Sequence, residues 1–202
     1  RHPRRRDFQG LIDWRMAMCA EQDVTFRFNT YAEASDVIEL LPDMVIVATG
    51  GLPNTTFLEE GEDLVDTSWD VMAGEVTAET ALVFDDNGAH PALMAAEVLA
   101  KAGTKVRFVT PERMVAPLVG GTNHPAYMKA FGEEDVEISL NLNLTRVTRE
   151  GNRLTAHLWN EYADRTETAT VDKVVVEHGT LPLSEVYEAL KPLSRNGGAL
   201  DH

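Results

Sequence analysis

The middle of the chain carries the pattern of apolar segments that is typical of a strand–helix–strand unit. Residues 81–84 and 106–109 are short apolar runs, and residues 91–102 between them place apolar side chains at helical spacing. Gly103 follows the helical segment, at a point where a glycine commonly ends a helix. About thirty residues cover the unit, which is the length that a right-handed crossover between parallel strands requires. This pattern predicts an α/β fold with a parallel sheet.

The next part of the chain changes to the alternation that is typical of antiparallel strands. After a short helix expected at 127–134, the runs at 136–149, 153–162 and 166–176 alternate and are rich in β-formers. The turn at 150–152 contains a glycine and makes the first two runs a hairpin. We therefore predict an antiparallel meander after the parallel unit, as in a Rossmann-like nucleotide-binding domain.

The first eighty residues have weaker periods. They predict a helix over 7–22, a strand over 24–28, a helix over 32–41, a strand over 45–48 and one helical turn over 68–73. Residues 51–80 otherwise read as a crossing linker, because they show no long period and are rich in acids and glycines.

Two strand ends resemble each other. Within residues 43–54, an apolar strand ends in Ala48, Thr49 and Gly50, and a turn follows at once. Within residues 174–183, an apolar strand is followed by the motif Gly-x-x-Pro. Ligands of open α/β sheets bind at the carboxyl ends of strands, and a glycine there allows a backbone or a cofactor to approach closely. Thr49 and Gly50 are therefore candidate cofactor-binding residues.

Six segments carry a resemblance to a known family. They are PRRRDFQGLIDW, VIVATGGLPN, TSWDVMAG, LVFDDNGAHPALMAAEVLAKAG, VRFVTPER and VVVEHGTLPL. In this order they resemble the C-terminal FAD/NAD(P)-binding-like region of the NADH:flavin oxidoreductase family, of the trimethylamine dehydrogenase and 2,4-dienoyl-CoA reductase type. The resemblance implies a partial flavin-type domain and linker at 1–79, an NAD(P)-binding-like domain at 80–180, and the start of a return segment to the flavin-type domain at 181–202.

The turn between residues 84 and 92 should hold the cofactor. A dinucleotide-binding turn needs Gly-x-Gly-x-x-Gly, whose glycines let the pyrophosphate approach the helix amino terminus. Two registers are open, because the three positions hold either Asp86, Gly88 and Pro91, or Asn87, Ala89 and Ala92. Neither keeps three glycines, and Asp85 and Asp86 bring negative charge toward a diphosphate. The turn is either an altered, weak nucleotide site or a vestigial turn that only maintains the fold.

Glu112 and Arg113, which follow the predicted strand at 106–109, complete the candidate site. Glu112 stands where an acid can hold a ribose hydroxyl, and Arg113 could hold a 2′-phosphate. Because the turn lacks the glycines of the motif, Glu112 and Arg113 can also be interpreted as charged residues of a solvent-exposed loop. No nucleophile motif is present, and we assign no catalytic or metal-binding residue.

Within the resembling family, the state of this turn distinguishes two branches. Members like trimethylamine dehydrogenase carry a non-glycine turn and pass electrons to a partner flavoprotein, whereas the dienoyl-CoA reductase branch keeps the glycines and takes electrons from NADPH. The degenerate turn therefore places this chain nearer the first branch.

The net charge and the cysteine content argue against several kinds of partner and cofactor. With 18 basic and 33 acidic residues the net charge is −15, which argues against nucleic acid and anionic membranes as partners. The positive charges at the start, Arg1, Arg4, Arg5 and Arg6, fit a solvated loop better than a nucleic-acid arm. The single cysteine, Cys19, cannot ligate an iron–sulfur cluster. No apolar run approaches the roughly 18 residues of a membrane span, so the cytoplasm is the expected compartment.

We therefore expect a fragment of a flavin-dependent oxidoreductase that acts on amine (N-demethylating) or enoyl substrates. The resemblance implies FMN, an iron–sulfur cluster and FAD or ADP in the parent enzyme, with the catalytic barrel outside this chain. The isolated chain should be inactive, hold no cofactor tightly and self-associate. Its partners would be the missing barrel and flavin-type half-domain, with an electron-transfer flavoprotein as a further candidate. The alternatives are a free NAD(P)-binding module and a non-catalytic interaction domain.

Overall fold

The computed structural model describes residues 7–198 and divides them into two compact units. The first unit comprises residues 53–179, and the second is built from the residues before and after it. Residues 53–79, expected as a linker, are thus grouped with the first unit. The basic cluster at the start of the chain lies outside the described residues.

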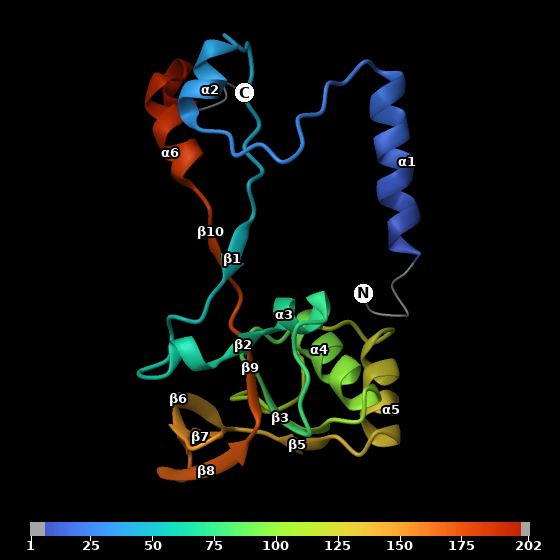
Figure 1. The fold of residues 1–202 in the computed structure, drawn as a ribbon, viewed down its shortest axis with the longest axis vertical. Helices are drawn as coiled ribbons and strands as arrows, with labels where there is room; N and C mark the ends of the chain where they lie inside the picture. Colours follow the sequence, from blue (N-terminus) through green and yellow to red (C-terminus); the bar gives the residue numbers. More distant parts are fainter. Residues whose placement is uncertain (1–6, 199–202) are drawn as a thin grey trace. The chain divides into compact units, whose positions relative to one another are not determined.

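A five-stranded parallel sheet forms the centre of the first unit (Figure 1). Its strands, in spatial order, are β2 (Asp66–Thr67), β9 (Lys173–Glu177), β3 (Thr80–Asp85), β4 (Lys105–Val109) and β5 (Glu137–Ser139). Val83 of β3 is in register with Phe108 of β4 on one side and with Val175 of β9 on the other. The predicted parallel pairing of residues 81–84 with 106–109 is therefore confirmed.

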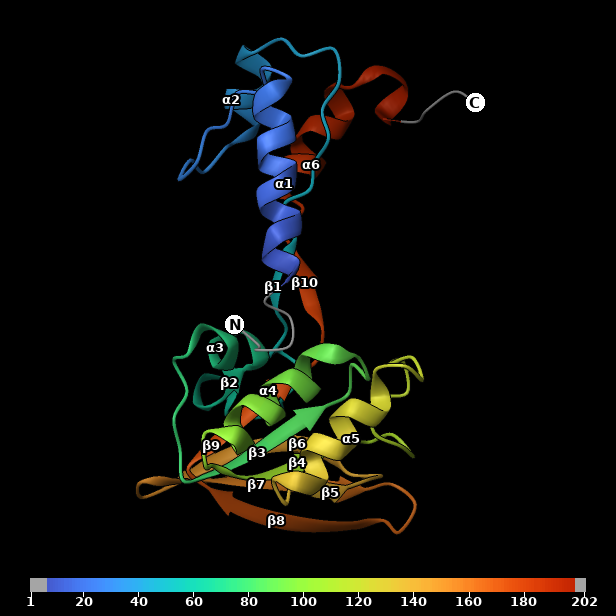
Figure 2. The same cartoon turned by 90° about the vertical axis from the view of Figure 1, so that its right-hand side faces the viewer.

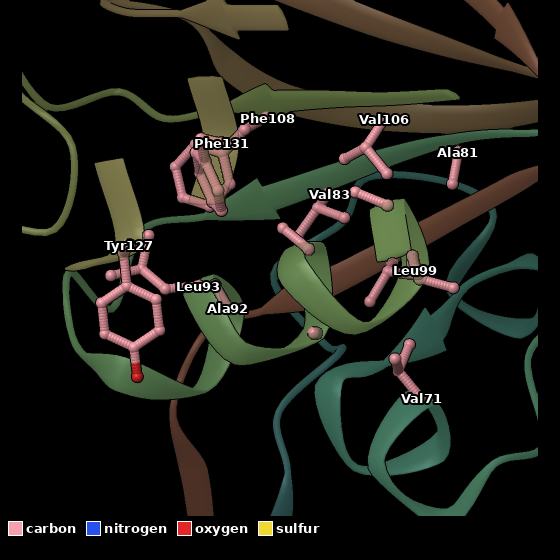
Figure 3. Packing of buried hydrophobic residues seen from close by; sticks show 14 of the residues in the cluster. Val71, Ala81, Val83, Ala92, Leu93, Leu99, Val106, Phe108, Tyr127 and Phe131 are labelled. Carbon is pink, nitrogen blue, oxygen red and sulfur yellow. The ribbon is translucent and has the colours of Figure 1, made fainter. Parts of the chain in front are cut away.

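Three helices cover one face of this sheet. They are α3 (Ser68–Ala73), α4 (His90–Lys101) and α5 (His124–Glu133), and Figure 2 shows α4 and α5 lying along the sheet. Figure 3 shows their apolar side chains packed against Val83 and Phe108, and all the residues that it labels belong to one buried cluster. Helix α3 begins with a capping box in which Thr67 and Asp70 each satisfy a backbone N–H of the other's segment.

An antiparallel sheet covers the opposite face. Its strands are β6 (Asn143–Glu150), β7 (Arg153–Asn160) and β8 (Arg165–Val171), and a glycine with positive φ, Gly151, turns the chain between the first two. Leu82 and Phe84 of β3 point into this second core, whereas Ala81 and Val83 point into the first. The predicted α/β fold with a parallel sheet and an antiparallel meander is confirmed.

Two of the three predicted meander runs are each divided between the two sheets. The run at 136–149 contains β5 and β6, and the run at 166–176 contains β8 and β9. The expectation of one continuous strand per run is therefore wrong. The physical reason is visible in β9, where Val174, Val175 and Val176 are all buried, because a strand covered on both faces loses its alternation.

The second unit contains α1 (Phe8–Glu21), α2 (Ala34–Glu39), α6 (Glu185–Leu190) and the short 3-10 helices η3 (Lys191–Leu193) and η4 (Arg195–Gly198). The short strands β1 (Gly51–Pro53) and β10 (Thr180–Pro182) form a two-stranded sheet. The first unit adds one more 3-10 helix, η2 (Glu62–Leu64). The predicted helices over 7–22 and 32–41 are confirmed.

The predicted strands over 24–28 and 45–48 are wrong, because both segments are extended or turn-like and pair with no strand in the described part of the chain. A strand needs a neighbour for its backbone groups. The side chains of these two segments are also poorly buried: Phe28 is 65% and Ile46 is 83% exposed. Within residues 7–198, no helix combines the length and the apolar character needed to cross a membrane.

Two glycines in the first unit share one backbone conformation and differ in their surroundings. Gly61 has φ +86 and Gly74 has φ +87, but a Cβ on Gly61 would lie 2.0 Å from the Val147 carbonyl oxygen, whereas nothing lies within 4 Å of one on Gly74. We expect Gly74→Ala to cost about 1–2 kcal/mol of unfolding free energy through the left-handed backbone alone. Gly61→Ala should cost roughly 2 kcal/mol more, because backbone must move.

Urea unfolding of the two variants tests this comparison. Equal costs would show that the segment around Gly61 moves away from Val147 without penalty, contrary to the packing described here.

Candidate functional site

Polar side chains gather at the carboxyl ends of the parallel strands in the first unit. Asp85 ends β3, and its register partner Glu177 ends the adjacent strand β9. Ser68 follows β2, the strand on the other side of β9. This edge is where open α/β sheets bind ligands.

Asp85 is fully buried and binds the turn that follows it. Its Oδ1 accepts a hydrogen bond of 3.0 Å from the backbone N–H of Gly88, whereas its Oδ2 is buried and meets no hydrogen-bond partner in the described residues. Burial raises the pKa of Asp85 to about 7, the charge of Glu177 adds to the rise, and the bond from Gly88 opposes it. A buried carboxyl group at this edge is therefore half-satisfied.

Glu177 connects the strand end to three neighbouring segments. Its side chain accepts hydrogen bonds from the Ser68 hydroxyl and, at 3.0 Å, from the Asn87 side-chain amide. The backbone N–H of Gly179 donates to the same carboxylate at 3.3 Å. Since Glu177 is 6% exposed, these donors replace the water that the carboxylate loses.

Asp86 faces a histidine rather than the backbone of the turn. Its Oδ1 lies 2.6 Å from Nδ1 of His178, and the His178 ring stacks on Phe57 with centroids 4.3 Å apart. Phe57 in turn stacks on Phe84, at 5.6 Å, and so joins this pair to the core below. The backbone N–H of Asp86 donates to the Glu177 carbonyl oxygen at 3.2 Å.

The chain itself covers the turn at Gly88. Gly88 has φ +66, its carbonyl oxygen accepts a hydrogen bond of 2.9 Å from the N–H of Leu118, and a Cβ on it would lie 3.0 Å from Pro117 Cδ. The covering segment includes Ala116, which is fully buried and adopts a left-handed φ of +46. Both the backbone conformation and the close approach require glycine at position 88.

The first turn of α4 distinguishes the two registers of the glycine motif. The helix begins at His90, so Ala92 lies in its first turn, where the third glycine of the motif packs against the strand. Ala92 is fully buried in the same core as Val83. This placement favours the register Asn87, Ala89, Ala92, in which small residues remain at two of the three positions.

The other predicted site residues belong to other segments of the chain. Glu112 and Arg113 are exposed in the loop after β4. Thr49 and Gly50 belong to the second unit, where the Thr49 hydroxyl donates to the Leu183 carbonyl and the Gly50 carbonyl accepts from the Leu183 N–H at 3.0 Å. Of the six candidates, the structure brings together Asp86 and Gly88.

Sequence reasoning missed Glu177 and Ser68 as parts of the site, and it considered Asn87 only as a position of the glycine motif. The available signal was an acid directly after the three valines of β9, since a carboxylate that ends a buried strand needs partners. In the described residues, no group of three His, Cys, Asp or Glu side chains is arranged to hold a metal ion. The cluster can therefore donate to and accept from polar groups, but it offers no recognisable nucleophile.

We expect Asp85→Asn to raise stability more at high pH than at low pH. Between the unfolded pKa of 3.8 and the folded value of about 7, the folded state holds a proton that the unfolded state releases. Stability from this group therefore falls as the pH rises through that window, and it is constant above about 7. Removing the carboxylate should shift the stability difference between variant and wild type by roughly 3 kcal/mol from pH 5 to pH 8.

Urea unfolding at both pH values measures the effect, with Glu112→Gln as the control for an exposed carboxylate in the same unit. A pH-independent difference for Asp85→Asn would contradict the raised pKa.

Comparisons with known proteins find relatives of this chain. No protein-family model matches the chain. A "Probable N-methylproline demethylase" from Rhizobium meliloti is 46% identical over 99% of this chain and 30% of its own length. An N,N-dimethylglycine/sarcosine dehydrogenase from Chromohalobacter salexigens is 37% identical, and a multifunctional alkene reductase/demethylase from Caballeronia cordobensis is 34% identical, each over 98% of this chain and 30% of its own length.

Solved structures agree with these relatives. The 6-hydroxypseudooxynicotine amine oxidase of Pseudomonas geniculata N1 matches 97% of this chain and 30% of its own, with a TM-score of 0.80 and 25% identity. The histamine dehydrogenase of Rhizobium sp. 4-9 has the same fold over 89% of this chain and 29% of its own, with a TM-score of 0.77 and 22% identity. The chain spans about 30% of the length of the curated relatives it matches, and it is homologous to that one region of each of them.

Proposed function

We propose that this chain is the nucleotide-binding-like region of a flavin-dependent oxidoreductase that demethylates N-methylated amino acids. The observation that carries the proposal is the 46% identity, over 99% of the chain, with a protein named for N-methylproline demethylation. A second relative is named for dimethylglycine and sarcosine, which are also N-methylated amino acids. Reduction of enoyl substrates is the second candidate, because a third relative is named both alkene reductase and demethylase.

In this proposal the catalytic flavin lies in a part of the longer protein that this chain does not cover. Flavin would accept the two electrons that leave the N-methyl carbon. FMN, FAD or ADP, and an iron–sulfur cluster remain proposals for that longer protein. The cluster would need cysteines from outside this chain, whose single cysteine is Cys19.

The turn after β3 does not fit a nicotinamide dinucleotide. The backbone N–H of Gly88 already donates to Asp85, the N–H of Asp86 donates to Glu177, and Pro117 lies against Gly88. A diphosphate would have to displace these contacts and would meet the carboxylates of Asp85 and Glu177. We infer that electrons leave the enzyme for a protein acceptor, such as an electron-transfer flavoprotein, rather than for NAD(P)⁺.

We expect the 202-residue chain to bind NADH and NADPH with a Kd of about 1 mM or weaker, equivalent to about 4 kcal/mol of binding free energy. The reason is the intramolecular occupation of the turn described above. Titration calorimetry with both nucleotides measures it. Micromolar binding would reject the proposal for this region and favour a free NAD(P)-binding module.

The longer protein that contains this region should release formaldehyde from N-methylproline or dimethylglycine. Oxidation of an N-methyl group followed by hydrolysis gives formaldehyde and the demethylated amine, so formaldehyde reports on the reaction. We expect turnover with an artificial electron acceptor and at least a hundredfold less with NAD⁺ or NADP⁺, a difference of about 2.7 kcal/mol in activation free energy. Reduction of enoyl substrates without any formaldehyde would instead support the second candidate.

A further inference from the structure

We propose that Asp85 is an internal ligand of the turn between β3 and α4, and that it occupies a backbone donor, the Gly88 N–H, which a dinucleotide's diphosphate would use. The turn is then a dinucleotide site in which a side chain of the same chain takes a position of the diphosphate. The inference rests on the proposed function, because it explains why a fold of this type would not serve NAD(P)H.

The first step concerns the donors of the turn. The Asp85 carboxylate accepts a hydrogen bond from the N–H of Gly88 at 3.0 Å. In dinucleotide-binding folds, backbone N–H groups of this turn and the helix that follows point at the pyrophosphate. Carboxylate and phosphate oxygens accept the same charge-assisted bonds. Asp85 therefore supplies from within the chain the anion that the turn is built to bind.

The second step concerns the position of the side chain. Asp85 has no exposed surface, although it ends a strand at the edge where ligands bind. Its Oδ2 is buried and meets no partner in the described residues. A carboxylate that served only to stabilise the fold would be expected to have both oxygens satisfied. Among the described residues, the bond from the Gly88 N–H is the hydrogen bond that the structure gives to this carboxyl group.

Asp85 and the adjacent Asp86 differ in what their carboxylates contact. Asp86 carries the same charge, but its carboxylate pairs with His178 at 2.6 Å. Its side chain remains about a quarter exposed, at 26%. Removing Asp86 would thus remove a charge from the vicinity without freeing the Gly88 N–H. The two adjacent carboxylates form a natural pair of test and control.

The variants Asp85→Ala, Asp85→Asn and Asp86→Ala distinguish occupation from charge. Alanine at 85 removes the acceptor, whereas asparagine keeps a side-chain oxygen as acceptor and removes the charge. In titrations of the 202-residue chain with NAD⁺, we expect Asp85→Ala to bind at least tenfold more tightly than wild type. Asp85→Asn and Asp86→Ala should stay within threefold of wild type. Asp85→Val, which fills the buried position with an apolar side chain, replaces Asp85→Ala if that variant does not fold.

Amide hydrogen exchange gives a readout without nucleotide. Loss of the acceptor should speed exchange of the Gly88 amide at least tenfold in Asp85→Ala or Asp85→Val, and leave it unchanged in Asp86→Ala. Unchanged Gly88 exchange, no gain in NAD⁺ binding at position 85, or an equal gain in Asp85→Asn or Asp86→Ala would each overturn the inference. Tight binding by wild type would instead reject the proposed function, and the exchange measurement would still decide whether Asp85 occupies the turn.

Discussion

Burial of β3 and β9 on both faces is the constraint on which the first unit depends. Successive side chains of β3 alternate between the helix-side core and the meander-side core, and each buried Val, Leu or Phe contributes about 1.5–3 kcal/mol relative to an exposed one. Both faces of such a strand lie in an apolar core, so neither face can accommodate polar side chains. Polar residues can enter the arrangement at the strand ends, and Asp85 and Glu177 do so side by side. The site is therefore a consequence of how completely the sheet is covered.

At that edge, each carboxylate loses water on burial, and the two differ in how many hydrogen bonds replace it. Glu177 receives donors from Ser68, Asn87 and Gly179, which compensate for the loss of water. Asp85 has one oxygen bound and one unbound, so burial dominates and its pKa rises to about 7. Its bound oxygen accepts from the Gly88 N–H and so ties the end of β3 to the turn. The same donor cannot serve an external anion at the same time.

The sequence predicted the strand–helix–strand unit well, since the spacing of apolar residues in α4 and the glycine after it are local signals. It failed at residues 24–28 and 45–48, where β-like composition does not produce a strand without a neighbouring strand to pair with. It also could not divide the alternating runs between two sheets, because sheet membership depends on distant partners. For the site, Asp86 and Gly88 were found through the turn motif. Glu177 was not, since its position beside Asp85 follows from the pairing of β9 with β3 across most of the unit.

The two ends of the first unit meet: the N–H of Asn54 donates to the carbonyl oxygen of Gly179 at 3.0 Å. A block of chain whose ends adjoin can be inserted into, or deleted from, a host polypeptide at one point without stretching the host backbone. The host residues on either side need only a short bridge to replace it. The whole block could therefore be exchanged between proteins in a single insertion or deletion. The same geometry makes residues 53–179 suitable for transfer into another protein. It also suits them to circular permutation, in which the adjoining ends are joined and new termini are placed in a loop.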